Sequence, residues 1–330
     1  MNTTTIGLLV IMAFTTVCTN SYSQLAIDNS GNNNDPEHLV QNVLVSTGVA
    51  VSNVTFNGIT GTLDTINGKM IGYFDGVSSN IGMDNGILLS SGDVNNATGP
   101  NDDEGGMFFN QPWGVPGDSD LMQLSGMSML NAAKLEFDFE TVNDTVSFRY
   151  VFASEEYPEF TCGTFNDAFG FFISGPGISG SYSNGAKNIA LIPGTTTPVA
   201  INTVNMGVAG MFGDPANCTT IDSNWANYSS YYVNNGDGTN PSIDSTVQYD
   251  GFTTVLTAEV VLLPCQTYHI KLVVADALDE SYDSGVFLEA GSFGAAVGIP
   301  FAYTVDSVND ASCSGSSNGN INRNSNGRNG

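Results

Sequence analysis

Two acidic segments carry residue types and spacings that suit a metal ion. In the first, Glu155 and Glu156 follow a stretch rich in aromatic and branched residues, and Asn166 and Asp167 open the next such stretch. The second is ADALDESYDSG, residues 275–285. Calcium takes about six to eight oxygen ligands from carboxylates, amide side chains and backbone carbonyls. The candidate metal ligands are Glu155, Glu156, Asn166, Asp167, Asp276, Asp279 and Asp283.

These acidic segments have two interpretations. Each one connects two predicted strands, so a strand–loop–strand arrangement can bring its two ends close together. If the flanking strands are neighbours, both segments share one edge of the fold, and the clustered carboxylates repel one another unless a cation neutralises them. Calcium is then the predicted cofactor. The alternative is a set of acidic turns that are solvated or that cap backbone amides.

The same carboxylates could serve a glycosidase as an acid and as a nucleophile or base. Glu155 and Glu156 are adjacent, so on a strand they would face opposite sides and could not form that pair. Glu156 with Asp167 or Asp283 stays geometrically possible. The sequence contains no HExxH, and its two histidines lie in a predicted helix and a predicted strand. We therefore expect a protein that is not an enzyme.

A group of aromatic residues suggests a ligand-binding surface. Trp225, Tyr228, Tyr231 and Tyr232 lie within residues 195–246, a long polar region that predicts extended surface loops. Aromatic side chains beside amides can bind a sugar or a peptide, so a glycan or a surface protein is a possible partner. These side chains could equally pin a long loop to the body of the fold.

The cysteines could form disulfides if the protein is exported. Four of them remain if an N-terminal signal is removed, and an oxidising compartment permits disulfides. Cys162 and Cys218 both lie in polar loop sequence, so we expect these two to pair. Closing a loop of that size stabilises a fold by about 3–4 kcal/mol in the chain-entropy model. The pairing of Cys265 and Cys313 stays open, as does the alternative that some thiols remain reduced and buried.

Charge excludes one class of partner. The 330 residues include 33 acidic and 7 basic side chains, which gives a formal net charge of −26. So few cations cannot build a basic patch, and nucleic acid is therefore not an expected partner. The acidity either serves solubility alone or is screened by divalent cations.

The two ends of the chain differ from the rest. Residues 1–23 contain an apolar run and small residues before Gln24, which predicts a cleaved secretory signal peptide and a secreted or outer cell-surface location. The apolar run is too short to span a bilayer, and no transmembrane segment is expected elsewhere. Residues 299–330 are predicted to be a linker with a truncated repeat or a disordered tail.

The region between the ends predicts an all-β domain over residues 35–298. Residues 24–34 are polar and predict a flexible lead-in, Asp35 can cap a helix that extends to Leu44, and a weaker helical pattern covers residues 120–130. Most other apolar stretches are short and divided by Gly, Asn, Asp or Pro, and KLEFDFE (residues 134–140) alternates as a half-exposed strand does. We expect a β-sandwich, jelly-roll-like, with one or two short helices near the N-terminal half.

Several longer strings together resemble the choice-of-anchor L domain. They are PEHLVQNVLVSTGVAVSNVTFNG, GILLSSGDVNNATGPN, LEFDFETVNDTVSFRYVFASEEYPEF, NDAFGFFISGPGI and YHIKLVVADALDESYDSGVFLEAGSF. The resemblance implies an exported bacterial surface protein of a kind common in the Bacteroidetes, with no enzymatic activity to carry over. The tail DSVNDASCSGSSNGNI resembles the opening of an SprB-type repeat. We expect a calcium-stabilised binding or adhesion module; the alternatives are a structural spacer and, third, a carbohydrate-active enzyme.

Overall fold

The computed structural model describes residues 24–102, 114–236 and 246–294. It also describes two short strands near the C-terminus, β14 (Val308–Asn309) and β15 (Asn320–Ile321), which pair with each other. The predicted signal peptide, Cys313 and most of residues 299–330 lie outside the described residues.

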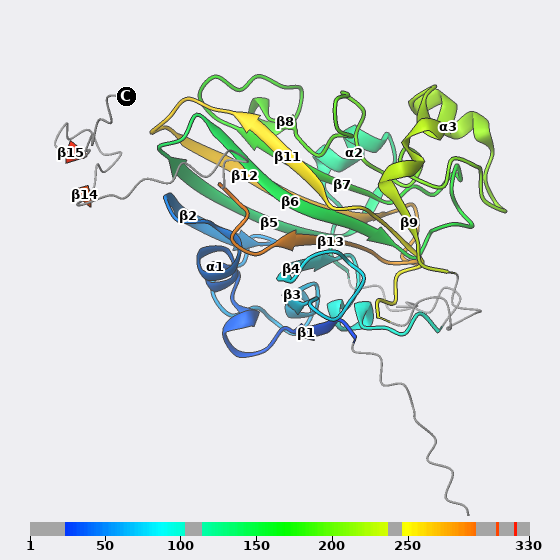
Figure 1. Cartoon of the computed structure of the whole chain (residues 1–330), viewed down its shortest axis with the longest axis horizontal. Coiled ribbons are helices and arrows are strands. Elements are labelled where there is room, and N and C mark those ends of the chain that lie inside the picture. The colour runs from blue at the N-terminus through cyan, green and yellow to red at the C-terminus, as the bar shows by residue number, and fades with distance from the viewer. Residues whose placement is uncertain (1–23, 103–113, 237–245, 295–307, 310–319, 322–330) are drawn as a thin grey trace, which may run out of the picture.

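The core of the described chain is built from two antiparallel sheets that pack face to face (Figure 1). The all-β sandwich predicted from the sequence is thereby confirmed. The first sheet has the order β1-β3-β4-β13-β6-β10-β9, with β11 also paired to β6, and the second has the order β2-β5-β12-β7-β8. The strands of the first sheet are β1 (Ala26–Asp28), β3 (Ile71–Asp75), β4 (Asn85–Ser90), β6 (Thr145–Ser154), β9 (Tyr232–Asn234), β10 (Gly251–Thr253), β11 (Leu256–Val261) and β13 (Ser284–Glu289). Those of the second are β2 (Val49–Phe56), β5 (Met129–Thr141), β7 (Ala168–Ser174), β8 (Lys187–Asn188) and β12 (Thr267–Ala277).

Alternation along β5 shows how the sequence builds these sheets. Leu135, Phe137 and Phe139 are buried in the core between the sheets, whereas Glu136 and Asp138 are half-buried on the outer face. Successive side chains of a strand point to opposite faces, so the predicted half-exposed strand is confirmed.

Aromatic side chains join the two sheets. Phe148 and Tyr150 of β6 meet Phe171 of β7, each with ring centroids 4.9 Å apart, and Phe152 stacks on Phe169 at 4.7 Å. Burying a side chain of this size stabilises a fold by about 1.5–3 kcal/mol. The aromatic stretch in front of the first acidic segment is therefore the centre of the core.

Two segments of three strands interlock at this centre. β6 lies between β13 and β11, whereas β12 lies between β5 and β7. In chain order the segments are β5-β6-β7 and β11-β12-β13, so each places its middle strand between the outer strands of the other. Every connection within them passes from one sheet to the other.

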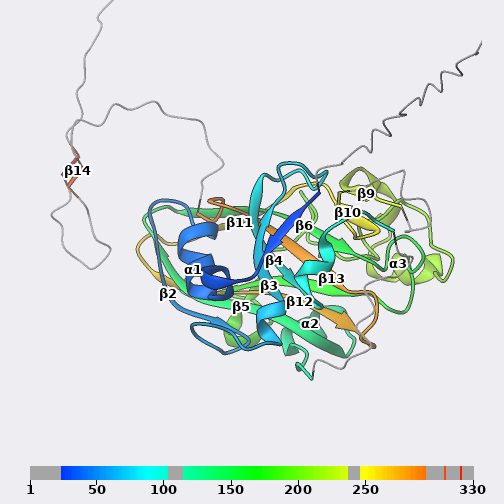
Figure 2. The ribbon, with the colours of Figure 1, turned by 90° about the horizontal axis from the view of Figure 1, so that it is seen from below.

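The predicted N-terminal helix is present. The Asp35 side chain accepts a hydrogen bond from the Glu37 amide and caps α1 (Pro36–Leu39), which continues as a π-helix, η2 (Val40–Leu44). α1 contacts both β2 and β3, so it covers the boundary between the sheets (Figure 2). Leu39 and Leu44 are fully buried there.

The second helix is shorter than its sequence pattern. Asp118 caps α2 (Ser119–Ser125), and Gly126 ends it with a left-handed backbone, φ 74°. Met129 and Leu130, predicted as helical, instead begin β5, because a glycine in this conformation is a strong helix stop.

Two corrections concern segments expected to lack regular structure. Residues 24–34, the predicted flexible lead-in, contain β1, which pairs with β3, and the neighbouring Leu25 is buried in the core. Residues 195–246 contain α3 (Pro215–Ile221), which Asp214 caps. The 3₁₀ turns are η1 (Gly31–Asn34), η3 (Asn67–Lys69), η4 (Val94–Ala97), η5 (Ser183–Gly185) and η6 (Trp225–Tyr231).

Candidate metal centre

The two acidic segments meet at one end of the sandwich. The first connects β6 to β7 and the second connects β12 to β13, and each passes from one sheet to the other. Ser154, the last residue of β6, pairs with Ser284, the first of β13, while Ala168 of β7 pairs with Ala275 of β12. The Glu155 amide donates to the carbonyl oxygen of Asp283 at 3.2 Å and joins the two connections. The expectation that both segments share one edge is thus met.

Most of the candidate ligands are buried. The side chains at this end that are at most 4% exposed are Glu155, Glu156, Asn166, Asp167, Asp276 and Asp283. Asp279 is exposed. We call Glu156, Asp167, Asp276 and Asp283 the buried carboxylate cluster. Burying an ionised carboxylate is costly unless another charge or several hydrogen bonds compensate it.

Hydrogen bonds across the sheets hold two members of this cluster. Asp167 accepts from the Ala277 amide and from the Ser284 hydroxyl, both at 2.8 Å. Asp276 accepts from the side-chain amide of Asn131 at 3.1 Å. Asp167 therefore ties β7 to β12 and β13 with both of its oxygens, which makes it a supporting residue more than an open ligand.

Other oxygens of the cluster lack such bonds. Among the described residues, both carboxylate oxygens of Asp283, Oε2 of Glu156 and Oδ1 of Asp276 are buried without a hydrogen-bond partner. Oδ1 of Asn131 is also buried without a hydrogen-bond partner. The ion pairs formed by the described lysines and arginines do not include any residue of the cluster.

The carboxyl groups also raise one another's pKa. Burial is the largest cause of the raised pKa of all four groups, and it brings the pKa of Asp276 to about 7. The charge of Asp276 further raises the pKa of Glu156, Asp167 and Asp283. This mutual effect shows that the four groups lie close enough to repel, so the cluster favours any neutralising partner, whether protons or a cation.

The cluster is not a preformed metal cage. Within the described parts of the chain, no three His, Cys, Asp or Glu side chains are already arranged to hold a metal ion. A cation would have to draw the carboxylates together, with Asn131 as an amide ligand. The residues with an oxygen still unpartnered, and so open to a cation, are Glu156, Asp276, Asp283 and Asn131.

One predicted ligand has another role, and two others lie in a turn. Oδ1 of Asn166 accepts a hydrogen bond from the Asn202 amide at 3.0 Å, so this side chain fixes a neighbouring loop. Glu155 and Glu156 lie in a turn after β6 and not on the strand, and both are buried. The argument that they face opposite sides of a strand therefore does not apply to them.

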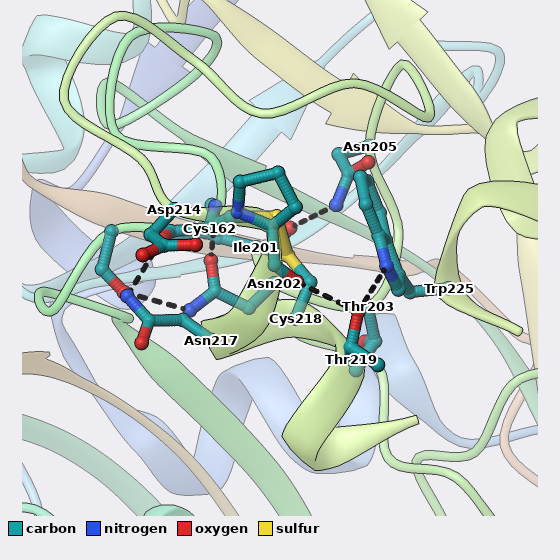
Figure 3. Close-up of a disulfide and its surroundings, with 12 residues drawn as sticks. Cys162, Ile201, Asn202, Thr203, Asn205, Asp214, Asn217, Cys218, Thr219 and Trp225 are labelled. Carbon is teal, nitrogen blue, oxygen red and sulfur yellow. Dashed lines mark hydrogen bonds between the residues drawn. A yellow bond between two sulfur atoms is a disulfide. The ribbon is translucent and has the colours of Figure 1, made fainter. Parts of the chain in front are cut away.

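The predicted disulfide between Cys162 and Cys218 is confirmed (Figure 3). It links the first acidic connection to α3. The Cys162 amide donates to Oδ1 of Asn202, and the side chain of Asn217 donates to the Cys162 carbonyl oxygen. The disulfide and these bonds hold the connection against the loop that precedes α3.

The predicted aromatic surface is partly buried. Trp225 is 8% exposed, packs against the disulfide and donates from Nε1 to the Thr219 hydroxyl at 3.2 Å (Figure 3). The Tyr228 hydroxyl donates to Asp222, and Tyr232 packs on Tyr157 with ring centroids 4.9 Å apart. Tyr231 packs at the edge of the core. All four side chains thus attach the loop region to the sandwich, and a ligand-binding role for them stays a prediction.

A second buried charged group was not predicted from the sequence. Nζ of Lys271, on β12, lies 2.8 Å from both carboxylate oxygens of Asp118 and 2.6 Å from Oδ2 of Asp120. The feature of the sequence that could have indicated this group is a single lysine inside the apolar strand HIKLVVAD. Asn131 was missed as well, because an asparagine in MLNAAK looks like an ordinary strand end.

Comparisons with known proteins show the family to which the chain belongs. Searches of curated proteins and of solved structures found no match. No helix in the described residues is long and apolar enough to cross a membrane. The family model of the choice-of-anchor L domain matches residues 26–294, most of the chain, and the protein therefore belongs to the choice-of-anchor L family.

Proposed function

We propose that this protein is an exported surface module that binds a partner, has no catalytic role, and uses calcium to hold its two sheets together at one end. Membership of the choice-of-anchor L family suggests a surface-associated, extracellular module. The observation that supports calcium is the buried carboxylate cluster with its unpartnered oxygens.

Calcium suits this cluster better than protons do. With a pKa of about 7, Asp276 remains partly ionised at neutral pH in a buried place, so protons alone leave charge inside the protein. A divalent cation neutralises two carboxylates at once, and calcium accepts both carboxylate and amide oxygens in flexible geometry. Glu156, Asp276, Asp283 and Asn131 would hold the ion, and Asp167 would support them through its bonds to Ala277 and Ser284.

Calcium would join the sheets because its ligands come from both. Asp276 and Asn131 lie on β12 and β5 of the second sheet, whereas Glu156 and Asp283 flank β6 and β13 of the first. Binding to the folded state alone stabilises it according to the ratio of calcium concentration to Kd.

Thermal unfolding of the purified protein tests this proposal. At a calcium concentration about 100 times Kd, the ion contributes about 2.7 kcal/mol, so Tm should rise by about 5–10 °C relative to EDTA. The double variant Asp276→Asn/Asp283→Asn should lose this rise, whereas Asp144→Asn, exposed in the turn between β5 and β6, should keep it. An unchanged Tm in the wild type contradicts the site, and an equal rise with magnesium would point to general charge screening.

A further inference from the structure

A solvent-exposed apolar tip lies beside the acidic end of the sandwich. Met211 is 80% exposed and Phe212 is 62% exposed, in the loop that leads to α3. In Figure 1, α3 lies at the right-hand end of the sandwich, where β6 ends. We call Met211 and Phe212, with the rings of Phe160 and Tyr282, the Met-Phe tip.

The rings of the tip come from three separate connections. Phe160 stacks on Phe212 with centroids 5.1 Å apart, and its ring lies 5.0 Å from that of Tyr282. Phe160 belongs to the β6–β7 connection and Tyr282 to the β12–β13 connection. Isolated exposed apolar residues are common on protein surfaces, but a stacked group drawn from three loops is a contiguous patch.

Backbone contacts hold the tip in its exposed position. The amides of Gly210, Phe212 and Asp214 donate to the carbonyl oxygens of Thr161, Glu159 and Cys162, each at 2.9 Å. A Cβ atom on Gly210 would lie 2.2 Å from the Pro158 carbonyl oxygen, and one on Gly213 would lie 1.9 Å from that of Thr161.

The glycines on either side of Met211 and Phe212 therefore allow the two loops to lie in contact. The disulfide at Cys162 strengthens the same arrangement. Because the two loops are tied together in this way, the two apolar side chains are presented to solvent by a fixed backbone.

The charges around the tip are all of one sign. Glu159 precedes Phe160, Asp214 follows Phe212 closely, and Asp279 and Glu280 precede Tyr282 in the same connection. Residues 155–167, 205–214 and 278–283 contain no Lys or Arg, and the whole chain has a formal charge of −26. A second copy of this chain, or an anionic membrane, would meet electrostatic repulsion here.

We propose that the Met-Phe tip is a docking surface for a cationic segment of a partner protein, one that carries apolar residues beside Lys or Arg. Aromatic faces attract Arg and Lys side chains, the surrounding carboxylates complement their charge, and methionine adapts to apolar side chains of varied shape. This inference rests on the binding role proposed above, although it does not depend on calcium.

Peptide binding to the full-length protein tests the inference. The probe is a fluorescent peptide that alternates Arg or Lys with Phe or Leu, and its anisotropy is measured at low and physiological salt. Two matched peptides serve as references: one with Glu in place of the basic residues, and one with Ala in place of the apolar residues. We expect binding of the first peptide only.

Variants then locate the contact. Met211→Ser/Phe212→Ser should weaken binding about tenfold or more, because it removes both the apolar contact and the ring face. Val77→Ser removes another exposed apolar side chain, away from the tip, and should leave affinity unchanged. Both variants should keep the wild-type Tm and its calcium response, which separates a failure of the tip from a failure of the calcium site.

Several results would overturn the inference. One is equal binding by the tip variant and the wild type, and another is the absence of binding by the cationic apolar peptide. Tip-dependent sedimentation with phosphatidylcholine vesicles would assign the patch to lipid. Concentration-dependent dimerisation that the tip variant abolishes would assign it to a second copy of the chain.

Discussion

One strand, β12, carries two buried charged groups that are neutralised in different ways. Lys271 lies between Asp118 and Asp120, so this group contains its own cation. Further along the strand, Asp276 lies among carboxylates that have no Lys or Arg partner among the described residues. The fold can therefore bury a lysine between α2 and the outer face of the second sheet. The two groups therefore differ in whether an ion pair with a lysine is present among the described residues.

Removal of the internal cation should have the largest effect. Lys271→Met leaves Asp118 and Asp120 buried without their cation, and breaking a buried pair in this way costs about 3–5 kcal/mol of unfolding free energy. Denaturant unfolding measures the loss. Lys134→Met, at a partly exposed ion pair 3.6 Å from Glu136, should cost no more than about 1 kcal/mol. An equal loss of unfolding free energy in the two variants would mean that the buried Lys271 ion pairs stabilise the protein no more than the partly exposed pair of Lys134 does.

Removal of one acid at the other end should have an effect whose sign depends on calcium. In EDTA at pH 8, Asp283→Asn should stabilise the protein by about 1–3 kcal/mol, because it removes a buried carboxylate whose pKa is raised by burial and by Asp276. With saturating calcium the same variant should be less stable than the wild type, because a ligand is lost. Chemical unfolding under the two conditions checks this reversal, and the same sign in both would contradict a cation site.

The acidic end should also respond to pH, and calcium should change that response. The folded-state pKa of Asp276 is about 7, above its ordinary value of 3.8, so the folded protein keeps a proton that the unfolded chain releases. Without calcium, stability is therefore greatest below about pH 4 for this group and declines as the pH rises to about 7. Calcium competes with protons, so its stabilisation should grow over the same range. Tm measured from pH 5 to pH 8, with calcium and with EDTA, tests both trends.

The smallest effect is expected on the outer face of the second sheet. Nδ1 of His269 lies 2.8 Å from Asp138 and Nε2 lies 3.4 Å from Glu136, and hydrogen bonding to Glu136 is the main cause of its raised pKa. Its contribution is present below its ordinary pKa of 6.5 and is lost as the pH rises through the folded-state value. The side chain is partly exposed, so solvent screening limits the effect of His269→Gln to about 0–1 kcal/mol at pH 6. A loss of unfolding free energy above that range would contradict the partial exposure of the His269 ion pairs.

The sandwich was predictable because strand signals are local. The alternation of Leu135, Phe137 and Phe139 with acidic residues marks β5 without any knowledge of its neighbours. The burial of Asp276 and Asp283 was not predictable in this way, because it depends on cross-sheet connections that bring β6, β7, β12 and β13 together. A carboxylate in a polar loop has the same sequence signature whether it is solvated or enclosed.

Other misses have the same cause. Lys271 meets partners on a helix more than a hundred residues earlier in the chain, which no local pattern can reveal. Trp225 is buried against the Cys162–Cys218 disulfide, and Cys162 comes from a connection much earlier in the chain, so the residues around Trp225 do not reveal its burial. The signal peptide, the role of calcium and the binding surface stay predictions.

The interlocked segments β5-β6-β7 and β11-β12-β13 have a consequence for folding kinetics. Neither segment can complete a sheet by itself, because each middle strand needs outer strands supplied by the other. Consecutive strands of each segment lie in different sheets, so neither segment can form a hairpin of its own. Proteins dominated by such distant contacts fold slowly and cooperatively, over milliseconds to seconds, since loop-closure entropy is lost before native contacts compensate it. A chain cleaved between β8 and β9 should accordingly lose its structure as a whole, so that the module is either fully formed or fully open to proteases.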